Sequence, residues 1–353
     1  MGKYTNIDDP SAHFQVALHS SANAATITND GNSDLQPDLI WSKARGAAYN
    51  HGLYDSTRGV TKFLSSNAAS AETTASSGFD LTSFNTDGFS TGNNQYNTIC
   101  GGTTYAAWQW KANGGTTASN SVGDISSTVQ ANTDAGFSIV TYTGNGSANQ
   151  TIGHGLGAVP KMILFKNRSN AAYWYVYHVA TGNDTMMYLN LTNAAQSLSS
   201  QFSTPTTTTF NVSNENSTFT GYNTSGNTYV AYCFAEKQGY SKFGKYEGNS
   251  NADGPFVYTG FKPAFVMLKP ADISEHWVIH DGTRDPFNKT YHYLFANESE
   301  AEASGGTHHI DLLSNGFKIR TSNNNWNTSS TVIYMAFAEN PFVTSTGIMG
   351  TAR

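Results

Sequence analysis

The chain has 353 residues, a formal net charge of −6 at pH 7, 12% charged residues and 13% aromatic residues. An acidic chain without a cluster of Lys or Arg is not expected to bind nucleic acid or an anionic membrane, and its apolar runs are too short to span a bilayer. Abundant Thr, Asn, Ser and Gly, mixed with aromatic residues, favour strands and turns over helices.

The first ten residues lack the apolar core of a secretory signal, so we expect the chain to fold in the cytoplasm of the cell that makes it. An internal repeat begins after them. The prolines at 37, 160 and 263 each open an apolar stretch that ends in Lys, and an aromatic residue stands 23 residues before each (37 − 14, 160 − 137 and 263 − 240). An alternating apolar segment closes each copy, at 105–112, 229–236 and 332–339. Such a period must be found first, because it decides the fold.

These landmarks divide the chain. We predict an N-terminal arm at 1–13, a first unit at 14–112, a middle unit at 137–236, a third unit at 240–339 and a C-terminal tail at 340–353. Residues 113–136 are rich in Gly, Ser, Thr and Asn and are interpreted as a flexible or extended linker, whereas 237–239 form a short connector. We therefore expect the middle and third units to pack tightly and the first to sit apart.

Each closing segment alternates with a period of two, which predicts a strand with one core-facing side. The residues on that side are Ala106, Trp108 and Trp110, then Val230, Tyr232 and Phe234, then Ile333, Met335 and Phe337. The stretch after each proline is apolar at nearly every position, as in a strand covered on both faces. Gly and Asn clusters mark hairpins. We predict an all-β chain of three tandem β-sandwich, jelly-roll-like repeats of about 100 residues, with helix confined to one or two short turns, best placed at Glu298–Ala303.

Two further features recur within the units. Trp174 and Trp277 lie 14 residues after their prolines, where the first unit has His51. Arg58 and Arg284 lie 21 residues after theirs, each three residues after an Asp, and the middle unit lacks this feature. Recurrence favours a packing role for the tryptophans.

The candidate glycan- or partner-binding residues are Trp326, Trp277 and His280. Trp277 and His280 could supply an aromatic platform and a hydrogen-bonding group for a sugar. Trp326 lies in an Asn/Ser loop, so we expect it to be exposed, and an exposed aromatic residue suits glycan or protein contact.

We predict neither a metal site nor a cofactor nor catalysis. Asp30–Asp34 resembles a calcium loop but lacks its Gly at position six and Glu at position twelve. The adjacent His308 and His309 cannot share one face of a strand. No nucleophile motif occurs, and Glu298, Glu300 and Glu302 are interpreted as a solvated face. The cysteines occupy non-equivalent positions, so we expect free thiols.

Several segments resemble a tandem-repeat family of virion or tail-associated proteins from marine bacteriophages, including phages of cyanobacteria and of pelagic heterotrophs. The segments that carry the resemblance are 4–11, 30–38, 53–59, 84–89, 153–160, 254–261 and 336–342, so it covers essentially the whole chain. The resemblance implies a setting in the virion but supplies no mechanism or binding residues.

We therefore expect a non-enzymatic virion structural protein, a tail fibre or tail-associated component that contributes to host-surface adhesion. A head decoration or neck protein, or a carbohydrate-binding lectin, are the alternatives. Expected partners are other virion proteins and a host surface glycan. The chain is expected to form a homo-oligomer, with a trimer favoured, although three units in one chain would also give a pseudo-threefold monomer.

Overall fold

The computed structural model describes residues 4–183, 185–198, 202–213, 222–306, 308–322 and 324–350. The predicted all-β fold is confirmed, because antiparallel strands build every sheet and the described helix is confined to η1 (Pro10–Ala12) and α1 (Asn324–Asn327). The helical turn expected at Glu298–Ala303 is wrong. Residues 298–302 have no regular secondary structure, Ala303 begins a strand, and the Glu302 N–H donates to the Arg45 carbonyl at 2.8 Å. Among the described residues, no helix is long and apolar enough to cross a membrane.

The first unit has a main sheet of order β1-β9-β3-β4-β5-β6 and a smaller sheet of order β2-β8-β7. The strands of the main sheet are β1 (Phe14–His19), β3 (Leu39–Ala44), β4 (Gly52–Asp55), β5 (Lys62–Leu64), β6 (Thr73–Thr74) and β9 (Tyr105–Trp110). The smaller sheet contains β2 (Ala25–Ile27), β7 (Leu81–Phe84) and β8 (Phe89–Thr91). An outer core that includes Ile40, Tyr54 and Phe89 joins the two sheets.

The middle unit has a main sheet of order β10-β11-β12-β19-β14-β15-β16-β17 and a two-stranded sheet, β13-β18. The strands are β10 (Ala118–Asn120), β11 (Ser127–Asn132), β12 (Phe137–Thr143), β13 (Gln150–Gly153), β14 (Pro160–Asn167), β15 (Tyr175–His178), β16 (Thr185–Tyr188), β17 (Gln196–Ser197), β18 (Thr209–Val212) and β19 (Thr228–Ala235). Its outer core includes Ile152, Phe165 and Phe210.

The third unit has a main sheet of order β20-β28-β22-β23-β24-β25 and a smaller sheet of order β21-β27-β26. The strands are β20 (Ser241–Glu247), β21 (Phe256–Tyr258), β22 (Phe261–Pro270), β23 (Val278–Asp281), β24 (His292–Phe295), β25 (Ala303–Ser304), β26 (Ile310–Leu313), β27 (Gly316–Ile319) and β28 (Thr331–Pro341). Its outer core includes Val266, Phe317 and Trp326.

The segment interpreted as a linker is instead part of the middle unit. β10 and β11 extend the main sheet beyond β12, with Val129 opposite Val140 in the β11–β12 register. The edge of β12 offers unpaired backbone groups, and an adjacent polar segment with some β-branched residues can satisfy them. The composition of 113–136 therefore concealed two paired strands.

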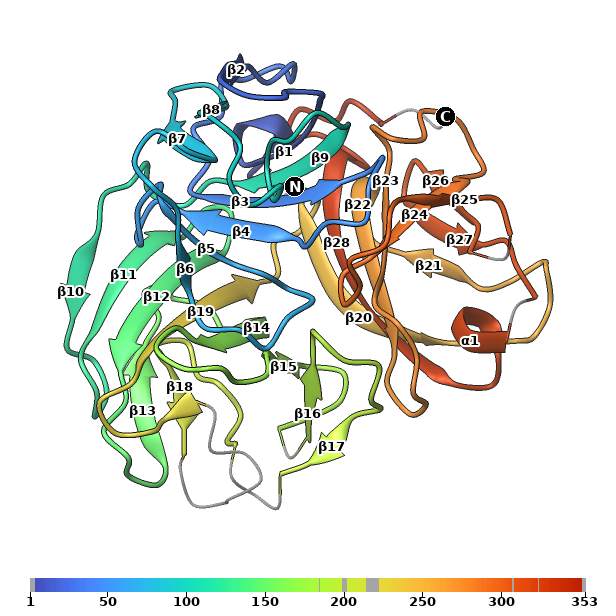
Figure 1. Cartoon of the computed structure of the whole chain (residues 1–353). Coiled ribbons are helices and arrows are strands. Elements are labelled where there is room, and N and C mark those ends of the chain that lie inside the picture. Colours follow the sequence, from blue (N-terminus) through green and yellow to red (C-terminus); the bar gives the residue numbers. More distant parts are fainter. Residues whose placement is uncertain are drawn as a thin grey trace.

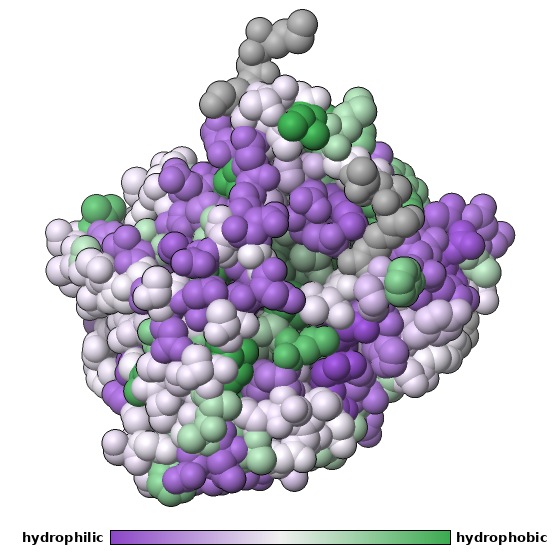
Figure 2. Space-filling view, turned by 90° about the horizontal axis from the view of Figure 1, so that it is seen from above, coloured by the Kyte–Doolittle hydropathy of each residue, from purple (hydrophilic) through white to green (hydrophobic). Residues whose placement is uncertain are grey.

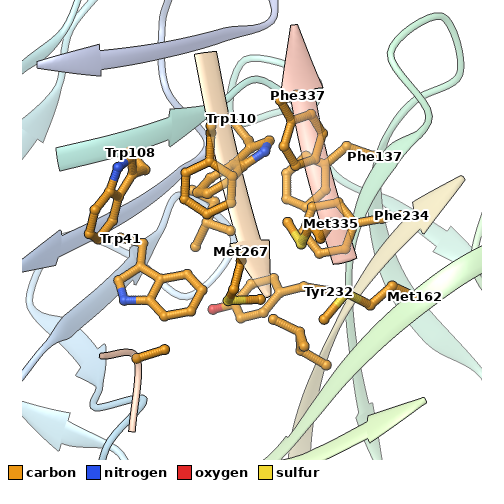
Figure 3. Packing of buried hydrophobic residues seen from close by; sticks show 14 of the residues in the cluster. Trp41, Trp108, Trp110, Phe137, Met162, Tyr232, Phe234, Met267, Met335 and Phe337 are labelled. Carbon is orange, nitrogen blue, oxygen red and sulfur yellow. The ribbon is translucent and has the colours of Figure 1, made fainter. Parts of the chain in front are cut away.

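The three main sheets surround a common centre, with the smaller sheets at the periphery (Figure 1). Every residue predicted for the inner side of the closing strands β9, β19 and β28 belongs to one buried cluster shared by all three units. The ring centroids of Trp110, Phe234 and Phe337 form a closed triangle with sides of 6.2, 5.5 and 6.0 Å (Figure 3). The expectation that the first unit sits apart is therefore wrong, because its closing strand is as apolar inside as the other two and is buried only against them.

Because the core is shared, truncating one ring should weaken the whole molecule. We expect Trp110→Ala to lower the free energy of unfolding by about 3–5 kcal/mol, as for other large-to-small core substitutions. Denaturant unfolding, followed by tryptophan fluorescence and by circular dichroism, should still give one transition. Phe256→Ala, at a half-exposed position, is the control and should change stability by about 0.5 kcal/mol or less. Two separate transitions in Trp110→Ala would contradict the shared core.

Candidate functional site

The three residues predicted to bind a glycan or a partner are all buried. Trp277 and His280 are each 1% exposed, and the Trp277 indole N–H donates to the Tyr188 carbonyl of the middle unit, at 2.9 Å. Trp326 is 3% exposed, so its predicted exposure is wrong. Its ring fills the outer core of the third unit, stacked on Phe295 with centroids 6.3 Å apart. None of these rings is available for stacking on a sugar.

His280 and Trp326 do lie near each other, around a void that His308 and His309 also line. Its volume is about 10 Å³, which is no more than one water molecule needs. Within the described part of the chain, no group of three or more His, Cys, Asp or Glu side chains is placed to hold a metal ion. These histidines and Trp326 therefore pack against one another rather than form a binding site.

Buried charged residues instead concentrate at the three interfaces between units, which are called seams below. Lys43, Lys166 and Lys269 each stand six residues after their proline, are fully buried, and donate to a carbonyl of the preceding unit. The acceptors are Ser299 at 3.1 Å, Ala69 at 2.8 Å and Thr192 at 3.0 Å. Desolvation lowers the pKa of Lys43 and Lys269 to about 8 and that of Lys166 to about 7. The same contact thus closes all three seams.

The residue 14 positions after each proline repeats this pattern. Trp174 donates from its indole nitrogen to the Ser65 carbonyl of the first unit, at 2.8 Å, just as Trp277 does to the middle unit. His51, at the same position, places Nε2 3.0 Å from the Phe295 carbonyl of the third unit. The sequence correctly equated these positions but did not reveal that their partners lie in another unit.

The recurring Asp and Arg form ion pairs that also cross the seams. Asp55 and Arg58 pair in the first unit, and the Tyr232 hydroxyl of the middle unit donates to the Asp55 carboxylate at 2.7 Å. In the third unit Asp281 pairs with Arg284 at 2.5 Å and accepts the Trp108 indole N–H of the first unit at 2.9 Å. Each acid therefore holds a residue from the inner face of the next unit.

The middle unit lacks this pair for a visible reason. At its seam with the third unit, the residue equivalent to Trp108 and Tyr232 is Met335, which has no N–H or O–H to donate. His178 occupies the Asp position, and its Nε2 lies 3.1 Å from the Tyr334 carbonyl. A buried carboxylate without that donor would cost free energy, and the sequence avoids it.

Two glutamates extend these pairs. Glu302 was expected on a solvated face, but its side chain is 8% exposed and binds Arg45 of the first unit as well as Arg284, at 2.8 and 2.9 Å. Glu72 likewise joins Arg58 to Arg168 of the middle unit, both at 2.9 Å. The expectation for Glu302 is wrong because its partner lies 257 residues away. The carboxylates of these two residues act as structural counterions.

The two partners of a seam ion pair should be energetically coupled. We expect Asp281→Ala to lower the free energy of unfolding by about 3–5 kcal/mol, because the Arg284 guanidinium stays buried without its nearest counterion. Asp281→Ala combined with Arg284→Met should cost less than the sum of the two single changes. Lys245→Ala, in an exposed pair with Glu247, is the matched control and should be nearly neutral. Additive costs, measured by urea unfolding, would contradict the coupling.

Buried histidines add a dependence on pH. In His178, Nε2 lies beside a carbonyl while Nδ1 accepts the Ala180 N–H at 3.1 Å, so the ring is held neutral with its proton on Nε2. His51 is held in the same way, since Nδ1 accepts the Trp41 indole N–H at 2.9 Å. Burial lowers the pKa of His178 to about 4 and of His51 to about 3. A proton on Nδ1 would face another hydrogen-bond donor, the Ala180 N–H in His178 and the Trp41 indole N–H in His51.

Stability should therefore fall as the pH drops below about 6.5. Between pH 6.5 and 4.5 the unfolded chain binds protons on these histidines and the native chain does not, which favours unfolding. We expect each to contribute about 2 kcal/mol of that loss. His178→Gln, which keeps a donor and an acceptor but carries no charge, should flatten the curve of unfolding free energy against pH in this window. An unchanged slope would contradict the assignment.

A cleft lies where the N-terminal arm crosses the boundary between units. Its volume is about 460 Å³. The N-terminal arm, the segment that precedes β12 and the connector between the middle and third units line it, through Tyr4, Thr5, Asn6, Ile7, His13, Asp134, Lys237 and Gln238. Sequence reasoning missed this site, because no single segment carries a motif.

A second feature distinguishes the third unit from the others. The β23–β24 connection covers residues 282–291, whereas the equivalent connections cover only 56–61 and 179–184. Phe287 in this longer loop is 80% exposed. The loop is held by the Asp285 carboxylate, which accepts the Tyr291 and His292 N–H groups, and by the Asn288 amide, which bonds both backbone groups of Leu312 at 2.8 and 2.9 Å. An apolar ring is thus presented to solvent on an anchored loop.

A family model for a domain of unknown function, DUF7483, matches residues 9–341. The chain belongs to this family. The match begins beside η1 and ends with β28, so one family domain spans all three units. This agrees with the core that the three units share. No curated protein and no solved structure matches this DUF7483 chain.

Proposed function

We propose that this protein is a non-enzymatic structural component of a bacteriophage particle, a tail fibre or tail-associated protein that contributes to adhesion. The observation that carries the proposal is the closed body of three main sheets around one aromatic core, joined by equivalent seams. Such a body resembles a symmetric trimer built from one chain, and virion fibres are commonly trimeric. The resemblance of the sequence to tail-associated phage proteins supplies the setting.

The surface suits an assembly or adhesion role. Hydrophilic residues and residues of intermediate hydropathy cover most of the face shown in Figure 2, with hydrophobic residues scattered among them. Within the described residues, the buried acids and bases of the seams are consumed in structural pairs and no metal-binding cluster occurs. This use of the buried charges supports a structural role.

Phe287 is our candidate contact with a neighbouring virion protein. Protein interfaces commonly depend on a few aromatic anchors, and those on rigid loops lose little conformational entropy on binding. The Phe287 loop meets both conditions and has no equivalent in the other units.

Immunogold labelling of intact particles tests the proposal. We expect antibodies against the purified chain to label particles at the tail. Label on the capsid would support a head decoration or neck protein, and absence of the chain from purified particles would refute both assignments.

A substitution at Phe287 tests this contact. Phe287→Ser should leave thermal stability unchanged but reduce the number of chains per particle, counted by quantitative mass spectrometry against the major capsid protein. Val122→Ser, at another half-exposed apolar residue, is the matched control. Equal incorporation of both variants would remove Phe287 from the proposal.

A further inference from the structure

The cleft described above has rigid walls. The Tyr4 hydroxyl donates to the Gly260 carbonyl at 2.7 Å, and the Thr5 hydroxyl donates to the Gln238 carbonyl at 2.8 Å. Ile7 anchors the same arm in the central core and is 5% exposed. The site is therefore formed before any ligand arrives, which lowers the entropic cost of binding.

The groups around this cleft are polar and mostly uncommitted. In the described part of the chain, the Asn6 and Gln238 amides make no side-chain hydrogen bond, and neither the Asp134 carboxylate nor the Lys237 ammonium makes an ion pair. Amides both donate and accept, a carboxylate accepts and an ammonium donates. Such a set is complementary to adjacent hydroxyl groups, each of which also donates and accepts.

Aromatic rings complete the lining. Tyr4 and His13 are both partly exposed, and His13 is braced by an edge contact with Tyr240 at a centroid distance of 5.8 Å. The Asn132 side-chain amide lies 3.2 Å from His13 Nδ1 and fixes the orientation of the ring. Rings with apolar faces and polar edges suit a ligand that has both C–H faces and hydroxyl groups.

Other ligand classes fit less well. One lysine beside one carboxylate gives no net positive field for a phosphate or a nucleotide. Asp134 is the only carboxylate among the described lining residues, which is too few oxygen ligands for a bound cation. A lipid chain would need an apolar lining, and Ile7 is the one aliphatic residue that the described chain contributes. The volume of about 460 Å³ lies in the range of small-molecule sites.

We propose that this cleft binds a short saccharide, one or two sugar residues of a surface glycan, through Asn6, Asp134 and Gln238 with Tyr4 and His13 as flanking rings. The inference deepens the proposed adhesion function and rests on it. An open polar site of this kind binds one sugar weakly, so adhesion comes from many copies on one particle that engage one glycan surface together.

Saturation-transfer difference NMR on the full chain tests the proposal. The probes are glucose, galactose, mannose, N-acetylglucosamine and glucuronic acid, each at millimolar concentration, with inorganic phosphate followed separately by ³¹P line broadening. We expect transfer to at least one sugar and no broadening of phosphate. Asp134→Ala combined with Gln238→Ala should raise the Kd of that sugar at least about tenfold, because two exposed hydrogen-bonding groups are lost.

The control is Asp30→Ala, which removes an exposed acid outside the lining and should leave the Kd unchanged. Unfolding curves of all variants should superpose, since Asp134 and Gln238 are exposed. No transfer to any sugar, transfer that survives the double substitution, or binding of phosphate instead would overturn the inference. Labelling of particles does not depend on this result, so failure here leaves the virion assignment standing, and unlabelled particles would leave a sugar-binding protein of another setting.

Discussion

The structure depends on the mutual burial of three sheet faces that cannot be covered in any other way. Each closing strand turns three apolar side chains toward the centre, and the smaller sheet of its own unit covers only the opposite face. Full burial of one such side chain contributes about 1.5–3 kcal/mol, so exposing three would cancel most of a typical net stability of about 5–15 kcal/mol. A unit on its own would be left with an exposed aromatic face. This constraint explains why the first unit cannot sit apart and why the polar sequence at 113–136 does not detach it.

Contacts between apolar faces discriminate little between one neighbouring unit and another. The polar contacts at the seams therefore determine the order in which the three units are arranged. Asp55 accepts a hydrogen bond from the Tyr232 hydroxyl of the middle unit, and Asp281 accepts one from the Trp108 indole N–H of the first unit. His178, at the equivalent position, lies beside the Tyr334 carbonyl of the third unit. Exchanging two units would place a buried carboxylate opposite Met335. Since a buried charge without its partner is more costly than an imperfect apolar contact, the seams select one cyclic arrangement.

Sequence reasoning succeeded where the determinant is local and failed where it is distant. The period of two in the closing strands correctly identified the inner residues, and the prolines correctly aligned the seam lysines without revealing their role. Trp326 was misplaced because a polar loop predicts exposure, whereas the outer core beside Phe295 requires a large ring. Glu302 was misread because Arg45, its partner, belongs to another unit. The cleft was invisible for the same reason, since its segments meet only in the folded chain.

Fusion of three similar sheets into one chain also frees their exteriors to differ. The equivalent lysines and ring contacts keep the centre nearly threefold, while β10 and β11, the Phe287 loop and the cleft break that symmetry in the described residues. A homotrimer would present three copies of every surface feature. A single chain instead presents different surface features on its three units, such as the Phe287 loop of the third unit and the added strands of the middle unit. An asymmetric surface therefore distinguishes this single chain of three units from a homotrimer of identical units.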